Sequence, residues 1–158
     1  IVHALKYRDT MEAGLLMARL MARAGQPLIG EADVIIPVPL HRFRLWGRRF
    51  NQAAFLSQQI SRQFGKAYRS DVLKRTRATR SQVGLSSDER RKNVAKVFQV
   101  MPEAVGHIAG RRVLLVDDVL TTGATAGSCA AVMKKSGAAH VDVLTFALVL
   151  EPKRPHIG

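Results

Sequence analysis

The stretch VLLVDDVLTTGAT, residues 113–125, decides how this chain folds and where it should bind a ligand. Its first four residues form a continuous apolar run, which is typical of a strand buried in a parallel sheet. Asp117 and Asp118 follow directly, so we expect both acids at the carboxyl end of that strand. Because open α/β sheets bind ligands beyond the carboxyl ends of their strands, the run predicts a ligand site around these acids.

The turn that follows the acids is rich in threonine and glycine and is suited to binding an anion. We expect a positive φ at Gly123, and a helix that begins at about Ala124 and ends at Gly137. The positive dipole end of that helix would face the turn, so a phosphate monoester fits there without a lysine. The alternative is a buried turn in which the acids only cap the helix. The residues predicted to bind phosphate are Thr121, Thr122, Gly123, Ala124 and Thr125.

Apolar runs and helical patterns alternate along the rest of the chain. Helices are predicted over residues 10–24, 50–64 and 86–94, and strands over 33–39, 71–74, 97–100 and 140–150, with a loop over 75–85 and a connection over 101–110. This alternation predicts an α/β fold with a mostly parallel central sheet flanked by helices.

The composition favours one domain over residues 1–158, because 158 residues that are 47% hydrophobic suffice for one substantial core but not for two. Cys129 is the only cysteine, which excludes an internal disulfide and favours a small buried helix residue. The sequence contains no apolar run of the roughly 20 residues that span a bilayer and does not open on a signal peptide pattern. We therefore expect a soluble, cytoplasmic protein.

Positive charge is concentrated in the middle of the chain. The formal net charge is +13, and residues 41–96 carry fifteen basic side chains against three acidic ones. Such a concentration attracts polyanions, either a compact one such as pyrophosphate or an extended one such as nucleic acid. The charge alone does not choose between them.

The stretch 113–125 resembles the PRPP-binding signature of type I phosphoribosyltransferases, where PRPP is 5-phosphoribosyl 1-pyrophosphate. The resemblance implies that Asp117 and Asp118 contact the ribose hydroxyls and that the turn wraps the 5′-phosphate. It implies Mg²⁺ as the cofactor, held through PRPP with Asp117 and Asp118 nearby rather than by protein ligands alone. It also implies a type I phosphoribosyltransferase-like fold, with a small N-terminal hood region built from about the first forty residues.

Two other segments match parts of such a site. The loop after the first central strand takes the position of the family's pyrophosphate loop, which implies pyrophosphate binding by Pro39, Leu40, His41 and Arg42. A basic segment resembles the flexible loop that closes over PRPP and contains Lys74, Arg75, Arg77 and Arg80. From the residues alone, a proline-rich strand exit that binds nothing and a solvated charged surface remain the alternatives.

Three segments narrow the resemblance to the ComF/GntX-type proteins, which are linked to competence and DNA utilisation. They are IVHALKYRD at 1–9, PVPLHRFRLWGRRFNQA at 37–53 and RTRATRSQVGLSSDERRKNVAKVF at 75–98. Arg49 to Gln52 match an RGFNQ-like segment of that family, with arginine where glycine often stands. Members often carry a cysteine-rich zinc module at the amino terminus, and none of its cysteines is present in this chain.

The resemblance implies an enzyme that transfers the phosphoribosyl group to a nitrogen acceptor and releases pyrophosphate. Nothing resembles a glutaminase domain, so we do not expect glutamine-dependent amination by this chain alone. The alternative is a catalytically silent module that binds PRPP or DNA and serves DNA uptake or utilisation. Its single-stranded DNA contact would be a basic segment with one aromatic residue, namely Arg44, Trp46, Arg48 and Arg49. A homodimer is compatible with the sequence. The sequence does not identify the acceptor substrate.

Overall fold

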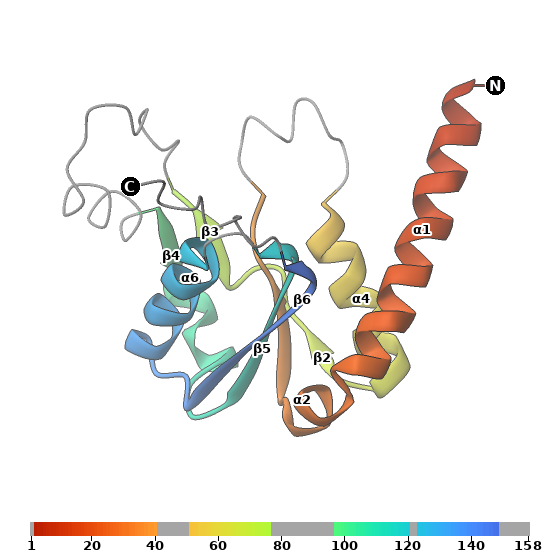
Figure 1. Cartoon of the computed structure of the whole chain (residues 1–158). Helices are drawn as coiled ribbons and strands as arrows, with labels where there is room; N and C mark the ends of the chain where they lie inside the picture. Colours follow the sequence, from red (N-terminus) through yellow and green to blue (C-terminus); the bar gives the residue numbers. More distant parts are fainter. Residues whose placement is uncertain (1, 41–50, 77–96, 121–122, 149–158) are drawn as a thin grey trace, which may run out of the picture.

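The computed structural model describes residues 2–40, 51–76, 97–120 and 123–148. Its elements are the helices α1 (Val2–Ala24), α2 (Gln26–Glu31), α4 (Gln52–Phe64) and α6 (Ala124–Lys135), the 3₁₀ helix η1 (Pro102–His107), and the strands β1 (Val34–Pro37), β2 (Ala67–Tyr68), β3 (Leu73–Arg75), β4 (Phe98–Val100), β5 (Arg112–Leu120) and β6 (His140–Leu148) (Figure 1). The predicted α/β alternation is confirmed.

Four of the strands form a parallel sheet in the order β2-β1-β5-β6. The register pairs Val34 of β1 with Val113 of β5, and Val113 in turn with Val141 of β6. The strands β3 and β4 pair antiparallel and form a separate two-stranded sheet. Because β5 is central and covered on both faces, its apolar run has no alternation of polar and apolar residues.

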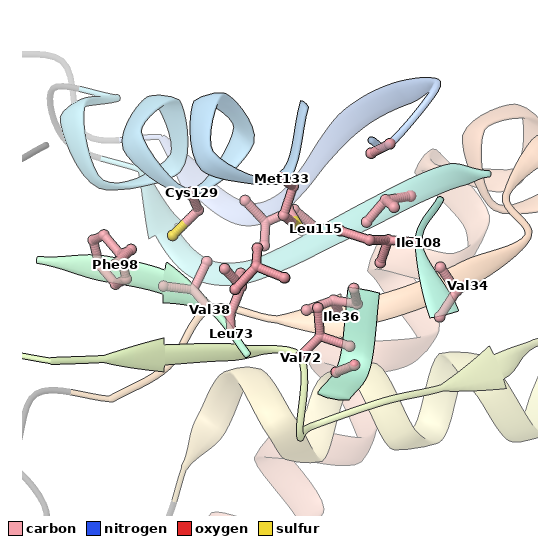
Figure 2. Packing of buried hydrophobic residues seen from close by; sticks show 14 of the residues in the cluster. Val34, Ile36, Val38, Val72, Leu73, Phe98, Ile108, Leu115, Cys129 and Met133 are labelled. Atoms are coloured by element: carbon pink, nitrogen blue, oxygen red, sulfur yellow. The ribbon is translucent and has the colours of Figure 1, made fainter. Parts of the chain in front are cut away.

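Helices cover both faces of the parallel sheet (Figure 1). On the side that we call the α6 face, Leu115 and Ile36 of the sheet pack with Cys129 and Met133 of α6, beside β3 and β4 (Figure 2). On the opposite side, the α1 face, Leu114, Val116, Ile35 and Leu144 pack with buried residues of α1, α2 and α4. Successive residues of β5 therefore pack into different hydrophobic clusters, because side chains alternate between the two faces of a strand.

The boundaries of α4 follow from its local sequence. Asn51 is its N-cap, and the Asn51 side chain accepts a hydrogen bond of 3.1 Å from the backbone N–H of Ala54. Gly65 ends the helix with a left-handed φ of 63°. The predicted helix over 50–64 with Gly65 as its stop is therefore confirmed within two residues.

The N-terminal region differs from the prediction in extent. α1 begins at Val2 rather than near Thr10, and Pro27 lies in the first turn of α2 instead of ending a helix. The second half of α1 packs closely on the sheet and on α4, since a Cβ added at Gly14 would lie 2.7 Å from the Phe55 ring. Its first half extends beyond the carboxyl ends of the strands, where a hood was expected (Figure 1).

The prediction also differs from the structure in other details. Arg75 belongs to β3 rather than to a loop, because it pairs with Phe98 across the hairpin. The connection over 101–110 contains η1, and β2 was not predicted because its two residues carry no periodic signal. The strand predicted over 113–116 continues to Leu120, since β6 pairs with β5 that far. The expected helix over 86–94 lies outside the described residues.

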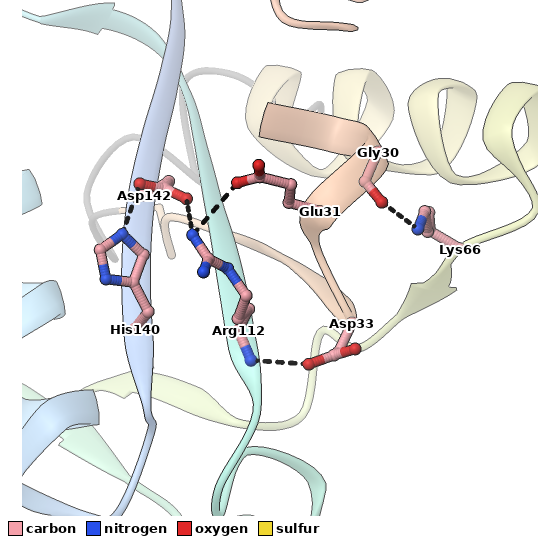
Figure 3. Close-up of polar contacts among 7 residues, drawn as sticks. All are labelled: Gly30, Glu31, Asp33, Lys66, Arg112, His140 and Asp142. Atoms are coloured by element: carbon pink, nitrogen blue, oxygen red, sulfur yellow. Dashed lines mark hydrogen bonds and ion pairs between the residues drawn. The ribbon is translucent and has the colours of Figure 1, made fainter. Parts of the chain in front are cut away.

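A polar network joins the elements at the amino ends of the strands (Figure 3). The Arg112 guanidinium lies 3.2 Å from a carboxylate oxygen of Glu31 and 3.8 Å from one of Asp142. Asp142 also contacts His140 at 2.9 Å, and Asp33 accepts a hydrogen bond of 2.8 Å from the Arg112 backbone N–H. These contacts tie α2 to β5 and β6 at the edge opposite the predicted ligand site.

Candidate functional site

Gly123 and the start of α6 have the backbone that the sequence predicted. Gly123 has a φ of 79° and is the N-cap of α6, which begins at Ala124. The Gly123 carbonyl accepts a hydrogen bond of 2.8 Å from the Gly127 N–H, so the first helical turn is closed. The helix therefore presents its amino terminus, with Ala124 and Thr125 exposed, at the carboxyl end of the central strand. Thr121 and Thr122 lie outside the described residues.

The two acids lie within β5 rather than just beyond it. Asp117 is level with Thr145 of β6, and each acid accepts a 2.9 Å hydrogen bond at Oδ1 from the N–H of the next residue. Strand alternation places Asp117 on the α6 face with Leu115, and Asp118 on the α1 face with Val116. The acids therefore face opposite sides of the sheet, although they are neighbours in the sequence.

Arg75 is held in place by the hairpin of β3 and β4. Its guanidinium carbon lies 5.3 Å from the centroid of the Phe98 ring, which is a cation–π distance. Arg75 is half-buried and pairs with Phe98 in the ladder. This predicted loop residue therefore presents a fixed cation, whereas Lys74 before it is exposed and Arg77 and Arg80 lie outside the described residues.

Cys129 lies close to the charges of both Asp117 and Arg75. The thiol is fully buried, and its pKa is raised from 9.0 to about 12, chiefly by burial, with a further increase from the Asp117 carboxylate and a partial offset from the Arg75 guanidinium. The charges of Asp117 and Arg75 therefore both lie within electrostatic range of Cys129 in α6. The expectation of a small buried cysteine in this helix is confirmed.

We expect the free energy of unfolding to fall as the pH rises from about 9 toward about 12. The unfolded thiol ionises near 9.0 and the folded one near 12, so only the unfolded state releases its proton in that window. Below pH 9 the contribution of the protonated Cys129 thiol to the free energy of unfolding is fully present. Urea unfolding of the wild type and of Cys129→Ala between pH 7 and 11 measures the effect. Parallel pH dependences of the two proteins would contradict the assignment.

The exit of β1 lies beside the acids of β5. The Val38 backbone N–H donates a 2.9 Å hydrogen bond to the Val116 carbonyl, and Pro39 and Leu40 follow, both half-buried. Two of the four residues predicted for the pyrophosphate loop thus lie at the same edge as Asp117. His41 and Arg42 lie outside the described residues, as do the predicted nucleic-acid contacts Arg44, Trp46, Arg48 and Arg49.

The arrangement combines a carboxylate, a fixed guanidinium and a helix amino terminus at one edge of a sheet. It is suited to an anionic ligand that also carries hydroxyl groups or a cation, since carboxylates accept hydrogen bonds and bind hard metal ions. In the described part of the chain, no three His, Cys, Asp or Glu side chains form a group able to hold a metal ion by themselves.

Sequence reasoning missed two features of this edge. It did not predict that Arg75 stacks on Phe98, because the two residues are brought together only by strand pairing. It also did not single out Phe146, which is an exposed aromatic residue at the same end of the sheet.

Among the helices of the described residues, none is long and apolar enough to span a membrane.

The model of the phosphoribosyl transferase domain family matches residues 51–157 of this chain. The chain is 35% identical over 154 residues to Competence protein F of Haemophilus influenzae, which covers 93% of this chain and 66% of that protein. It is 37% identical over 152 residues to the DNA utilization protein YhgH of Salmonella typhi, which covers 90% and 63%. The chain thus spans about two thirds of the length of these relatives.

Solved structures show the same architecture. The allosteric regulatory enzyme of purine biosynthesis matches with a TM-score of 0.59 and 21% identity, over 85% of this chain and 25% of that chain. The glutamine PRPP amidotransferase from B. subtilis, complexed with ADP and GMP, matches with a TM-score of 0.57 and 21% identity, over 83% and 25%. The purine phosphoribosyltransferase from Pyrococcus horikoshii Ot3 matches with a TM-score of 0.52 and 17% identity, over 88% and 85%. At these identities the likeness establishes the fold.

Proposed function

Because this chain belongs to the phosphoribosyl transferase domain family, and within it to the ComF-type proteins, we propose that it binds Mg²⁺–PRPP at the carboxyl edge of its sheet. The observation that carries the proposal is that Asp117 and the amino terminus of α6 lie at that edge, with Arg75 close enough to influence the same buried thiol, Cys129. Residues 1–158 would act as one domain in this function. The names of the two relatives connect those proteins with competence and with DNA utilization.

Each part of the site has a distinct role in this proposal. The turn over 121–125 and the first turn of α6 would bind the 5′-phosphate through backbone N–H groups. Asp117 and Asp118 would accept hydrogen bonds from the ribose hydroxyls and so orient the sugar. The segment Pro39 to Arg42 would hold the pyrophosphate, and Arg75 would place its positive charge near it, with Lys74, Arg77 and Arg80 nearby on the same segment.

The reaction would be displacement at the anomeric carbon. A bond forms between that carbon and a nitrogen of the acceptor while its bond to pyrophosphate oxygen breaks, and the pyrophosphate leaves with the electron pair. The acceptor nitrogen then loses its proton to water. Asp117 and Asp118 would help hold Mg²⁺, a hard cation that prefers oxygen ligands, and the metal would supply neutralisation of the negative charge on the leaving group. The protein's own contribution is orientation of the sugar and fixed positive charge at the pyrophosphate.

Calorimetry with PRPP in the presence of Mg²⁺, combined with a pyrophosphate-release assay over a panel of nitrogen acceptors, tests the proposal. We expect saturable binding of PRPP that depends on Mg²⁺, and release of pyrophosphate with at least one acceptor. Binding without turnover over the whole panel would favour a PRPP-binding module over an enzyme. Absence of PRPP binding at millimolar concentrations would overturn the proposed function.

A second candidate function is binding of single-stranded DNA, and the charge of residues 41–96 is the observation that favours it. Contacts to phosphates make the affinity fall steeply as the salt concentration rises, and the slope reports the number of phosphates neutralised. Filter binding of wild type and of a variant with alanine at Arg44, Trp46 and Arg48 measures it. Unchanged retention of DNA by the variant would remove this segment as the contact.

Replacing Arg75 with glutamine should weaken PRPP binding by about tenfold, because a charge-assisted hydrogen bond contributes about 1.5–3 kcal/mol and Arg75 is partly screened by solvent. The stacking on Phe98 holds the guanidinium in place, so Phe98→Leu should weaken PRPP binding in the same direction by a smaller factor. Lys134→Gln is the matched control, since Lys134 is an exposed cation near the other end of α6. Equal affinities for wild type and Arg75→Gln would remove Arg75 from the site.

A further inference from the structure

The outward side of α1 carries large apolar side chains that are exposed. Leu16 is 57% exposed, Leu20 is 48% exposed and Leu15 is 37% exposed, and these are three of the five large hydrophobic residues that are exposed in the described part of the chain. Ala18, by contrast, is buried and lies almost directly opposite Leu16 on the helix. Because α1 forms the outer flank of the molecule, its exposed face points away from the described sheet and helices (Figure 1).

Like charges are grouped at each end of this outward face. Asp9 and Glu12 are exposed one turn apart before the leucines, and Arg19 and Arg23 are exposed one turn apart after them. Like charges at this spacing repel each other within a helix. The helix dipole accounts for Arg23 alone, since its effect is confined to the first and last turns. Within the described residues, none of these four side chains forms a salt bridge that would offset the repulsion.

Helix geometry places the four charges in a symmetric pattern around Leu16. Asp9 lies seven residues before Leu16 and Arg23 seven residues after it, so each is about 10 Å away along the axis and about 20° away around it. Glu12 and Arg19 lie on one flank of Leu16, about 40° and 60° around the helix and about 5 Å away in opposite directions along it. Charges of opposite sign are therefore placed at matching distances on either side of Leu16.

We propose that the outward face of α1 binds a second copy of this chain, with the two α1 helices antiparallel and a two-fold axis beside Leu16. Such an interface is isologous, so each contact between the copies occurs twice. The charges select the direction, because a parallel copy would bring like charges together at both ends of the face. The antiparallel copy instead brings together, one from each chain, Glu12 with Arg19, Asp9 with Arg23, Ala13 with Leu20, and Leu16 with Leu16. The inference does not depend on PRPP binding.

The contact uses one face of one helix, so the dimer should be weak. Stable interfaces bury about 800 Å² on each partner, and transient ones bury less. Arg8, another exposed charge of α1, lies about 80° around the helix from Leu16 and so belongs to the rim of the contact. We expect monomers below about 10 µM, where unfolding is measured, and dimers at about 100 µM and above.

Analytical ultracentrifugation of the wild type and of charge-reversal variants tests the proposal. Glu12→Arg and Arg19→Glu each make like charges meet at both symmetry-related contacts, whereas the double variant with both changes restores opposite charges. Lys134→Glu is the matched control, because it reverses an exposed charge on α6, which covers the other face of the sheet. Far-UV circular dichroism of each variant shows whether α1 keeps its helix.

We expect either single variant to raise the dissociation constant of the dimer at least about tenfold, because two attractive contacts become repulsive. The double variant should return to within about threefold of the wild type, and an equimolar mixture of the two single variants should associate, because opposite charges then meet at each contact. Lys134→Glu should match the wild type. A wild type that stays monomeric at about 0.5 mM would overturn the inference, as would single variants that associate like the wild type or a double variant that does not recover.

Disulfide cross-linking tests the direction of the helices without changing these charges at the centre of the face. Residues at position 16 meet at the two-fold axis, whereas residues at position 23 of the two chains lie about 20 Å apart along it. Leu16→Cys should therefore form a linked dimer on mild oxidation, and Arg23→Cys should not. Cys129 is buried and does not compete. Equal cross-linking of both variants would indicate parallel helices, and no cross-linking of Leu16→Cys at about 0.5 mM would indicate another contact, so either result would overturn the inference.

Discussion

Replacing Asp117 with asparagine should weaken the binding of Mg²⁺–PRPP by roughly a hundredfold. Strand alternation places the carboxylate on the α6 face, within electrostatic range of Cys129 in α6, where the ribose and the metal-bound phosphates are proposed to lie. Charge-assisted hydrogen bonds contribute about 1.5–3 kcal/mol each, and each 1.4 kcal/mol corresponds to a factor of ten in affinity. Calorimetry on the wild type and on the variant measures the ratio.

The dependence on Mg²⁺ separates this prediction from a simple charge effect. Removing a negative charge near a polyanion strengthens its binding when no metal is present, so Asp117→Asn should bind PRPP no more weakly than wild type in EDTA. In the presence of Mg²⁺, the wild type should bind PRPP more tightly than Asp117→Asn. Asp142→Asn is the matched control, because Asp142 lies at the opposite end of the sheet in the network with Arg112. Equal losses in Asp142→Asn and Asp117→Asn would show that the effect is not local.

Asp118→Asn should cause a smaller loss of affinity than Asp117→Asn. The two acids lie on opposite faces of β5, and only Asp117 shares its face with α6. The amide of asparagine also still accepts a hydrogen bond from a ribose hydroxyl. Identical losses in the two variants would contradict the placement of Asp117 as the acid next to the metal.

Replacing Leu115 with alanine should lower the free energy of unfolding by about 2–5 kcal/mol. Leu115 is fully buried in the central strand and packs in the cluster that also contains Cys129 and Met133 (Figure 2). Removal of its side chain leaves a cavity between β5 and α6, because a strand paired on both sides cannot move to fill it. Urea unfolding monitored by circular dichroism measures the change.

The control for this prediction is Leu16→Ala. Leu16 is 57% exposed on α1, so the same chemical change there should alter the free energy of unfolding by less than about 0.5 kcal/mol. A loss below about 1 kcal/mol for Leu115→Ala would mean that the interface between the sheet and α6 is less tightly packed than the structure shows. Because Leu115 lies two residues before Asp117, the variant should also bind PRPP more weakly.

Much of the candidate site was predictable because its signals are local. The apolar run before Asp117, the glycine that takes a positive φ and the helix that begins one residue later all lie within thirteen residues of sequence. The same holds for α4, whose ends depend on Asn51 and Gly65. Local hydrogen bonds and backbone angles decide such features, so the sequence nearby carries the information.

The rest depended on pairing between distant segments. Residues 73–75 pair with 98–100, and this contact turned a predicted loop residue, Arg75, into a fixed cation over Phe98. The extension of β5 to Leu120 depends on β6, and it places the two acids on opposite faces of the sheet. A local sequence pattern does not reveal which strands pair, since strand pairing brings together residues far apart in the chain.

The sequence by itself determined the class of fold, the position of the central strand and the turn that precedes α6, because apolar burial and backbone preference act over a few residues. The tertiary structure decided which charges lie next to that turn and which side chains at the sheet edge stay exposed. Phe146 is exposed and level with Asp118 only because strand order and register place it there. Those neighbours are set by the packing of whole elements, whose geometry depends on all of the chain at once.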